Sequence, residues 1–156
     1  MRARAARPGD AAEIARIYNQ GIEERIATFE TRPRSVEEVA GWLSSPVVVV
    51  EEDGRVLAFA SSSAYSAREC YVHIAEFSVY TDRSARRRGA ARTALQELMS
   101  LARAAGILKL TSKVLVENTA SRAMLKSLGF REVGVHERHG QLDGKWHDVV
   151  VVETLL

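Results

Sequence analysis

Apolar residues recur with a helical period in two segments near the start of the chain. Apolar residues spaced three and four positions apart are typical of a helix with one buried face. The first stripe comprises Ile14, Ile17, Tyr18 and Gly21, and the second comprises Val39, Trp42 and Leu43. Asp10 stands three residues before Glu13, and Ser35 stands in the same relation to a glutamate. Both helices are therefore predicted to begin with a capping box.

The period then changes to the one expected of strands. The run Val47–Val50 is β-branched, and a strand is predicted there. Asp53-Gly54 is a typical hairpin turn, so a returning strand is expected over about Val56–Tyr65. A further strand is predicted over Tyr71–Tyr80. Its faces would be Val72, Ile74, Glu76, Ser78 and Tyr80 on one side and Tyr71, His73, Ala75, Phe77 and Val79 on the other.

The second half of the chain alternates between helical and extended patterns. A helix ending at Gly106 is predicted from the stripe Ala91, Ala94, Leu95, Leu98, Ala102 and Ala105. A strand over Ile107–Val116 and a short helix capped by Asn118 follow. The closing part is expected to comprise strands near Phe130–Arg138 and Trp146–Leu155 and a loop over Gly140–Gly144.

The resulting order of elements is β-α-α-β-β-β-α-β-α-β-β. This order predicts an α/β sandwich built on a mixed sheet. The chain has 156 residues, of which 46% are hydrophobic and 27% charged, so we expect a single globular domain spanning residues 1–156.

Composition and charge argue against several classes of partner. The net charge of +2 is too small to indicate nucleic acid by itself. Cys70 is the only cysteine, so no intrachain disulfide can form, which fits a reducing compartment. The chain shows no signal-peptide pattern and no apolar run near the roughly 18 residues of a membrane helix, so a cytoplasmic protein without a membrane partner is expected. The histidines show no metal-binding spacing, and no metal site is expected; they are His73, His136, His139 and His147.

Basic residues gather at one place, between a predicted strand and a predicted helix. They are Arg83, Arg86, Arg87 and Arg88, and Gly89 follows them directly. Such a turn can hold phosphate, because a helix N-terminus offers unpaired N–H groups and glycine allows a ligand to approach the backbone. The turn alone is equally consistent with a solvated basic loop, with or without nucleic-acid contacts.

The turn Arg86-x-x-Gly89-x-Ala91 resembles the acetyl-CoA signature of the GNAT superfamily of acetyltransferases. The segments Glu117–Ser121 and Leu128–Phe130 resemble a second hallmark of that superfamily. The resemblance implies the GNAT fold, with a mixed, mostly antiparallel central sheet flanked by helices, and acetyl-CoA as cosubstrate. The cofactor contacts that it implies are Phe77, Ser78, Val79, Arg86, Arg87, Arg88, Gly89, Ala90, Ala91, Asn118 and Ser121.

The resemblance also implies roles for these contacts. The strand backbone from Phe77 to Val79 would pair with the pantetheine arm, and N–H groups of the turn would hold the pyrophosphate. A strand N–H near Phe77 or Val79 would stabilise the oxyanion formed when the amine attacks the thioester. Preorganised donors of this kind lower a barrier by about 3 kcal/mol.

Four shorter segments resemble the phosphinothricin and arsinothricin N-acetyltransferase branch. They are Ile17–Asn19, Ala27–Glu30, Ala75–Tyr80 and Gly144–Asp148. Those enzymes acetylate the α-amine of glutamate-like antibiotics, so the resemblance implies a small amine substrate, a role in resistance and a homodimer. The stretch from Ile17 to Arg34 is more similar to the arsinothricin enzymes. The implied substrate contacts are Phe29, Glu30, Arg68 and Glu76.

Glu76 interrupts an otherwise apolar strand, and burying an unpaired carboxylate is costly. By the resemblance it receives the proton of the substrate amine, which is needed because an ammonium has no lone pair to attack with. An ion pair with an arginine, or an edge position facing water, would explain Glu76 without catalysis.

Two residues depart from the pattern of the branch. Leu125 stands where the branch usually has His or Tyr, so the CoA thiolate would take its proton from solvent or from a hydroxyl such as that of Tyr80. Ser66 stands where the branch commonly has one of two arginines that grip the acidic group of the substrate, and Arg68 keeps the other position.

Other functions remain open from the sequence. The acceptor can be another small amine or a protein amine. The chain can also be a CoA-binding module without turnover, and Leu125 gives this alternative some weight. A nucleic-acid module based on the arginine cluster comes last, because the chain shows no evident aromatic platform of the kind that such modules usually add. Finally, the apolar run Val149–Val152 exceeds what one core face needs, which predicts a self-paired interface.

Overall fold

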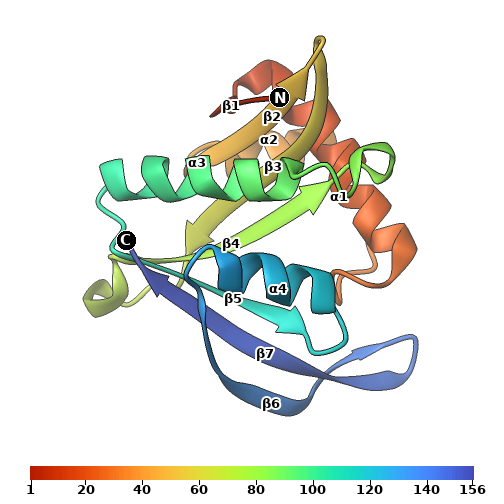
Figure 1. The fold of residues 1–156 in the computed structure, drawn as a ribbon, viewed down its shortest axis with the longest axis vertical. Helices are drawn as coiled ribbons and strands as arrows, with labels where there is room; N and C mark the ends of the chain where they lie inside the picture. Colours follow the sequence, from red (N-terminus) through yellow and green to blue (C-terminus); the bar gives the residue numbers. More distant parts are fainter.

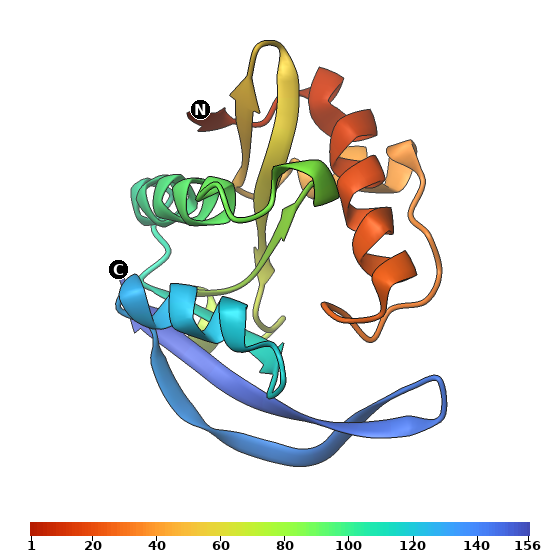
Figure 2. The same ribbon diagram turned by 45° about the vertical axis from the view of Figure 1, so that its right-hand side comes forward.

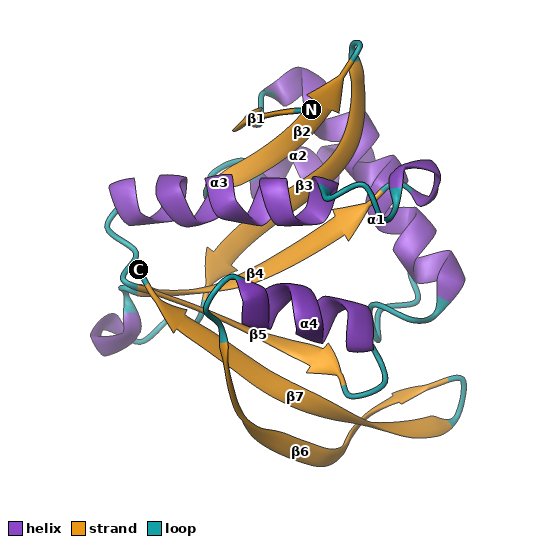
Figure 3. Ribbon diagram, viewed as in Figure 1, coloured by secondary structure: helices purple, strands orange, loops and turns teal.

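The computed structural model describes all residues from 1 to 156 and contains a seven-stranded sheet with the order β1-β2-β3-β4-β5-β7-β6 (Figures 1 and 3). The strands are β1 (Arg2–Ala5), β2 (Val47–Glu52), β3 (Arg55–Ala64), β4 (Ile74–Thr81), β5 (Lys109–Leu115), β6 (Arg131–Leu142) and β7 (Lys145–Leu155). The helices are α1 (Ala11–Glu24), α2 (Val36–Trp42), α3 (Ala90–Ala104) and α4 (Thr119–Ser127). None of them combines the length and the apolar character needed to cross a bilayer.

The pairing of β4 with β5 is parallel, and every other pairing in the sheet is antiparallel. Short 3-10 turns precede α1, β4 and α3, and the order of the remaining elements is the one expected from the sequence. The predicted α/β class, the mixed, mostly antiparallel sheet and the order of helices and strands are therefore confirmed.

Helices cover both faces of the sheet, with α1 and α2 on one side and α3 and α4 on the other (Figure 2). The valines of β2 alternate between these two layers. Val48 and Val50 pack in the cluster with α3, whereas Val47 and Val49 pack in the cluster with α1 and α2. Because β2 is covered on both faces, its sequence is a continuous β-branched run rather than an alternating one.

The two predicted capping boxes have different outcomes. The Ser35 box is confirmed: its hydroxyl accepts from the Glu38 amide at 3.1 Å, and the Glu38 carboxylate accepts from the Ser35 amide at 3.4 Å. The Asp10 box is wrong, because the Asp10 carboxylate accepts from the Arg7 amide at 2.7 Å and pairs with Arg4 at 2.7 Å. The guanidinium of Arg4 in β1 forms charge-assisted hydrogen bonds with the Asp10 carboxylate, and these replace the bond to a helix amide that an N-cap would make.

Strand β4 begins three residues later than predicted, at Ile74, because Glu69–Tyr71 forms a 3-10 turn. Within β4 the predicted alternation is confirmed. Ala75 and Phe77 are buried in the cluster with α3 and α4, and Glu76 between them faces the other side of the sheet. At the end of α3, Ala105 is exposed rather than buried, because the helix stops before it.

The C-terminal hairpin corrects two expectations. The turn is Asp143-Gly144, with left-handed φ values of 52° and 78°, so β6 and β7 extend through most of the loop predicted over Gly140–Gly144. The run Val149–Val152 lies on β7, an inner strand, and Val150 and Val152 belong to the core of this chain. It is therefore not surplus apolar surface. Exposed apolar side chains lie on the edge strand β6 instead, at Val133 and Val135.

Strands β4 and β5 separate after a short paired region. Ile74 to Glu76 pair with Lys109 to Thr111, and no further pairs follow. The Ser112 hydroxyl then donates to the Phe77 carbonyl at 2.9 Å, which replaces a backbone contact at the point of separation. This splay opens the interior of the sheet toward α4 and creates the site.

Candidate active site

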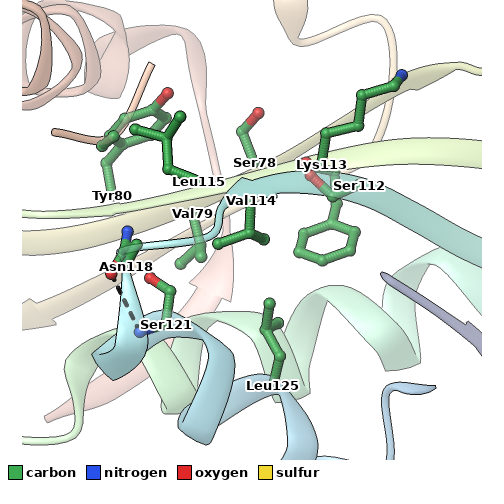
Figure 4. Close-up of a pocket in the computed structure, with 12 residues that line it drawn as sticks. Ser78, Val79, Tyr80, Ser112, Lys113, Val114, Leu115, Asn118, Ser121 and Leu125 are labelled. Carbon is green, nitrogen blue, oxygen red and sulfur yellow. Dashed lines mark hydrogen bonds between the residues drawn. The ribbon is translucent and has the colours of Figure 1, made fainter. Parts of the chain in front are cut away.

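A cleft lies between the diverging ends of β4 and β5, above α4 (Figure 4). It is lined by Ala27, Phe77, Ser78, Val79, Tyr80, Ser112, Lys113, Val114, Leu115, Asn118, Ser121 and Leu125. The carbonyls of His73 and Phe77 accept hydrogen bonds from the β5 side. Because the backbone N–H and C=O groups of alternate residues point to the same edge of a strand, those of Val79 also point into the cleft. Strand β4 thus offers an unpaired edge on which an extended ligand can add hydrogen bonds.

The N-terminus of α3 is a second place for a ligand. The amide N–H groups of residues 86 to 91 donate to no other atom of the protein. Arg87 and Gly89 have left-handed φ values of 62° and 84°, which turn successive N–H groups toward one concave side. A set of unpaired amides at the positive end of a helix binds phosphate oxygens well.

Carboxylates from other elements hold most arginines of this turn. Arg86 binds Glu24 of α1 through two hydrogen bonds of 2.6 and 2.8 Å, and this holds the pKa of Glu24 below its usual range. Arg88 binds Glu52 of β2 at 2.5 Å. Arg87 has no carboxylate partner, so its charge remains available for an anion.

Asn118 and Ser121 lie at the start of α4 and line the cleft (Figure 4). The Asn118 side-chain oxygen accepts from the Ser121 amide at 3.2 Å, so the predicted N-cap is confirmed. With the oxygen used in the cap, the Asn118 amide group remains able to donate to a ligand in the cleft.

A cavity of about 350 Å³ lies on the other side of the sheet, beneath the connection between α1 and α2. It is lined by Thr28, Phe29, Glu30, Ser61, Ser63, Glu76, Phe77, Ser78, Ser112 and Lys113. Glu76 also lines a smaller cavity of about 190 Å³ on the open face of β5 and β7. Its carboxylate lies 3.8 Å from the Lys113 ammonium, so its charged neighbour is a lysine rather than an arginine.

The connection between α1 and α2 is anchored at two points, near its end at Arg34 and in its middle at Phe29. The Asn19 side chain donates to the Arg34 carbonyl at 3.1 Å and accepts from the Arg34 amide at 2.9 Å. Phe29 packs against Gly140 of β6, where a Cβ atom would lie 2.7 Å from the ring. Phe29 is thus brought to the cavity through a contact that only glycine permits.

Glu30 lines the same cavity as Glu76 and is paired with Arg34 at 2.9 Å. Arg68 is placed elsewhere, over the ring of Tyr71 at 5.7 Å, and it lines neither cavity that adjoins Glu76. The structure therefore brings together Phe29, Glu30 and Glu76 and leaves Arg68 apart from them.

Tyr80 and Leu125 lie on opposite sides of the cleft (Figure 4). The Tyr80 ring packs against Tyr18 and Phe59, at centroid distances of 5.1 and 5.4 Å. Burial raises the pKa of Tyr80 above its usual range, so the hydroxyl stays protonated at neutral pH. Leu125 is 2% exposed and carries no proton to donate.

The sequence reasoning missed Lys113, although it could have been found as Glu76 was. Lys113 is a charged residue within the predicted strand Ile107–Val116, and it lines the cleft and both cavities. Gly140 carried no such signal, because its contact with Phe29 joins positions far apart in the sequence.

A splayed pair of parallel strands beside an amide-lined helix N-terminus defines a class of protein: transferases that bind an acyl group on a pantetheine arm with a pyrophosphate. The match of residues 3–151 to the model of the acetyltransferase (GNAT) domain shows that the chain belongs to the GNAT acetyltransferase family.

Similar proteins agree with this assignment. The chain is 31% identical to the L-amino acid N-acyltransferase MnaT of Escherichia coli, over 100% of this chain and 94% of that protein. It is 29% identical to the phosphinothricin N-acetyltransferase of Streptomyces coelicolor, over 96% and 95%. Among solved structures, the phosphinothricin acetyltransferase of Sinorhizobium meliloti in complex with acetyl-CoA superimposes with a TM-score of 0.91, at 29% identity over 99% and 88%.

The chain is therefore an acetyl-CoA-dependent N-acetyltransferase. Its own geometry fits this cosubstrate in two places. The open edge of β4 suits the amides of a pantetheine arm, and the unpaired amides before α3 suit the pyrophosphate.

Proposed function

We propose that the protein transfers the acetyl group to the α-amine of a small amino-acid analogue, such as phosphinothricin, arsinothricin or methionine sulfoximine. The observation that carries this proposal is the position of Glu76. Its carboxylate lines both cavities on the acceptor side, and the adjacent Phe77 and Ser78 line the cofactor cleft.

Acetyl-CoA supplies an activated acyl thioester. Phe77, Ser78 and Val79 would hold the pantetheine arm through the free edge of β4, with a strand N–H stabilising the oxyanion. The pyrophosphate would bind the amides of the turn, and Asn118 and Ser121 would close the cleft. The residues of the turn are Arg86, Arg87, Arg88, Gly89, Ala90 and Ala91.

On the acceptor side, Glu76 would take a proton from the substrate ammonium, directly or through water, and free the lone pair for attack. Phe29 and Glu30 would shape the pocket around the amine. Arg68 would contribute only if it left the ring of Tyr71, so we assign it a peripheral contact with the substrate.

The leaving thiolate needs a proton, and Leu125 cannot provide one. Tyr80 or solvent would supply it. The Tyr80 hydroxyl is protonated at neutral pH, but burial makes it a weak acid. A CoA thiolate leaves without much help, so a weak donor is sufficient for turnover.

The test of this function is release of the CoA thiol in the presence of a panel of amines. We expect turnover of phosphinothricin, arsinothricin or methionine sulfoximine and none of polyamines or of a peptide N-terminus. Turnover of the polyamine or the peptide alone would move the acceptor to another class. Acetyl-CoA binding without thiol release for any amine would contradict the proposal.

Acetylation removes the positive charge that such a toxin needs to mimic an amino acid, so the proposed role is resistance. We place the reaction in the cytoplasm, where acetyl-CoA is made and used. A homodimer is part of the proposal, with the exposed Val133, Val135 and Trp146 at its interface. Light scattering at the mass of one chain would contradict the dimer.

A further inference from the structure

Lys113 occupies an unusual position for a lysine. It lies within β5, an inner strand, and its side chain projects to the same side of the sheet as Ser78, away from Leu125 and α4 (Figure 4). It lines the cofactor cleft and both cavities that meet at Glu76. No helix covers this position, so the ammonium faces the space where the acceptor must lie.

The charges around the acceptor cavity are simple to count. Its charged lining residues are Glu30, Glu76 and Lys113. Glu30 is neutralised by Arg34 at 2.9 Å. One carboxylate and one ammonium therefore remain for a ligand, side by side, with 3.8 Å between Glu76 Oε1 and Lys113 Nζ.

The contact between Glu76 and Lys113 is weak and can be opened. The two side chains are 43% and 46% exposed, and exposed ion pairs contribute only about 0–1 kcal/mol. A zwitterionic ligand can insert between them, giving its ammonium to Glu76 and its carboxylate to Lys113. The solvent-screened pair of Glu76 and Lys113 is then replaced by two charge-assisted contacts with the ligand.

The arginine anchor expected for an acidic substrate is not available at this place. Ser66 uses its hydroxyl to accept from the Arg68 amide at 3.1 Å, and the Arg68 guanidinium lies over Tyr71. An anionic group near Glu76 therefore finds its nearest cation on β5.

We propose that Lys113 binds the carboxylate next to the acceptor amine and so restricts the enzyme to α-amino acids. This inference rests on the proposed function and names the residue that sets its specificity. An amine without the carboxylate leaves Lys113 unpaired, and a polyamine meets its charge as repulsion. Lys113 is thus a residue of substrate selection, distinct from the base at Glu76.

The test replaces Lys113 by Met, which keeps the aliphatic stem and removes the charge. Lys126→Met is the matched control, because Lys126 is an exposed lysine in the last turn of α4, which packs on the opposite face of the sheet. The acceptors are phosphinothricin and methionine sulfoximine, each beside its α-carboxamide, in which the carboxylate is replaced by a neutral amide.

For Lys113→Met we expect the KM of the carboxylate acceptors to rise about tenfold, the loss typical of one hydrogen bond to a charged group. The KM of the carboxamides and the KM of acetyl-CoA should stay within twofold of the wild-type values. Lys113→Arg should recover most of the loss, and Lys126→Met should change none of these constants.

An equal rise for carboxylate and carboxamide acceptors would overturn the inference, as would matching effects of Lys113→Met and Lys126→Met. Both outcomes leave the proposed function standing, because the wild-type enzyme would still acetylate amino acids. If the wild-type enzyme turned over no amino-acid acceptor, the proposed function would be wrong and the role of Lys113 with it.

Discussion

Single residues place the reacting groups, and several of their positions depend on partners that the local sequence pattern does not include. Glu76 could be singled out from the sequence because a carboxylate within an apolar strand needs an explanation. Asp10 could not be assigned correctly, because its guanidinium partner, Arg4, comes from a strand that the cap pattern does not consider. The contact of Phe29 with Gly140 could not be predicted from the sequence either, since no local pattern joins the two positions.

Gly140→Ala should disturb acceptor binding through Phe29. The new Cβ would lie 2.7 Å from the Phe29 ring, so the ring, which lines the acceptor cavity, has to shift. We expect the KM of the acceptor to rise several-fold with the KM of acetyl-CoA unchanged. Steady-state kinetics with each substrate varied in turn provide the measurement.

Gly134→Ala is the control for this change. Gly134 lies on the same strand, and a Cβ there meets nothing within 4 Å. Similar kinetics for the two variants would show that Phe29 is not the cause. In a Phe29→Ala background the effect of Gly140→Ala should largely disappear, because the clash is removed.

Elements provide the cofactor site, and here the sequence was most informative. The resemblance of residues 86–91 and of Glu117–Ser121 to the GNAT signatures predicted where acetyl-CoA contacts would gather. The separation of β4 from β5 was not predictable, because both strands read as ordinary extended segments. Their splay depends on tertiary contacts, among them the bond from Ser112 to the Phe77 carbonyl.

Gly89→Ala should weaken acetyl-CoA binding. Gly89 has a φ of +84°, so a side chain is strained there by about 1–2 kcal/mol, and its methyl group, which meets no protein atom within 4 Å, would occupy space that is open to a ligand. We expect at least a tenfold rise in the Kd of acetyl-CoA, measured by calorimetry.

Gly54→Ala is the control for Gly89→Ala, because it introduces a similar backbone strain away from the cofactor site. Gly54 has a φ of +76° in the hairpin between β2 and β3 and equally open surroundings. Both variants should lose similar stability, and only the change at Gly89 should affect the cofactor. Equal acetyl-CoA affinities for the two variants would remove the turn from the proposed pyrophosphate site.

At the scale of the whole molecule, a charge network around the buried Asp82 joins α1, β3 and the segment between β4 and α3. Asp82 is 1% exposed and accepts from the Ser84 amide and hydroxyl at 2.8 Å. Arg16 lies 2.6 Å from it, and Arg55 lies 3.3 Å away. Burial by itself raises the pKa of Asp82, but the Ser84 hydrogen bonds and Arg16 outweigh it, so the pKa falls below its usual range.

This network should make stability depend on pH in one direction. The pKa of Asp82 is lower in the folded state than in the unfolded chain, so its contribution is complete above about pH 4 and is lost as the pH falls further. Asp82→Asn should lower the free energy of unfolding by about 2 kcal/mol at neutral pH and flatten its decline in acid.

Urea denaturation at several pH values measures both effects. Asp53→Asn is the control, since Asp53 is exposed in the hairpin turn. The account of Asp82 would be wrong if the two variants showed the same pH dependence of stability.

The central claim concerns Glu76, and the pH dependence of kcat/KM for Glu76→Gln tests it most directly. With the base removed, kcat/KM should fall by about 10²–10⁴-fold near neutral pH, while the affinity for acetyl-CoA is unchanged. Activity should then recover only as rising pH deprotonates the acceptor amine itself. A variant that kept the wild-type kcat/KM and the wild-type pH profile would contradict the assignment of Glu76 as the base.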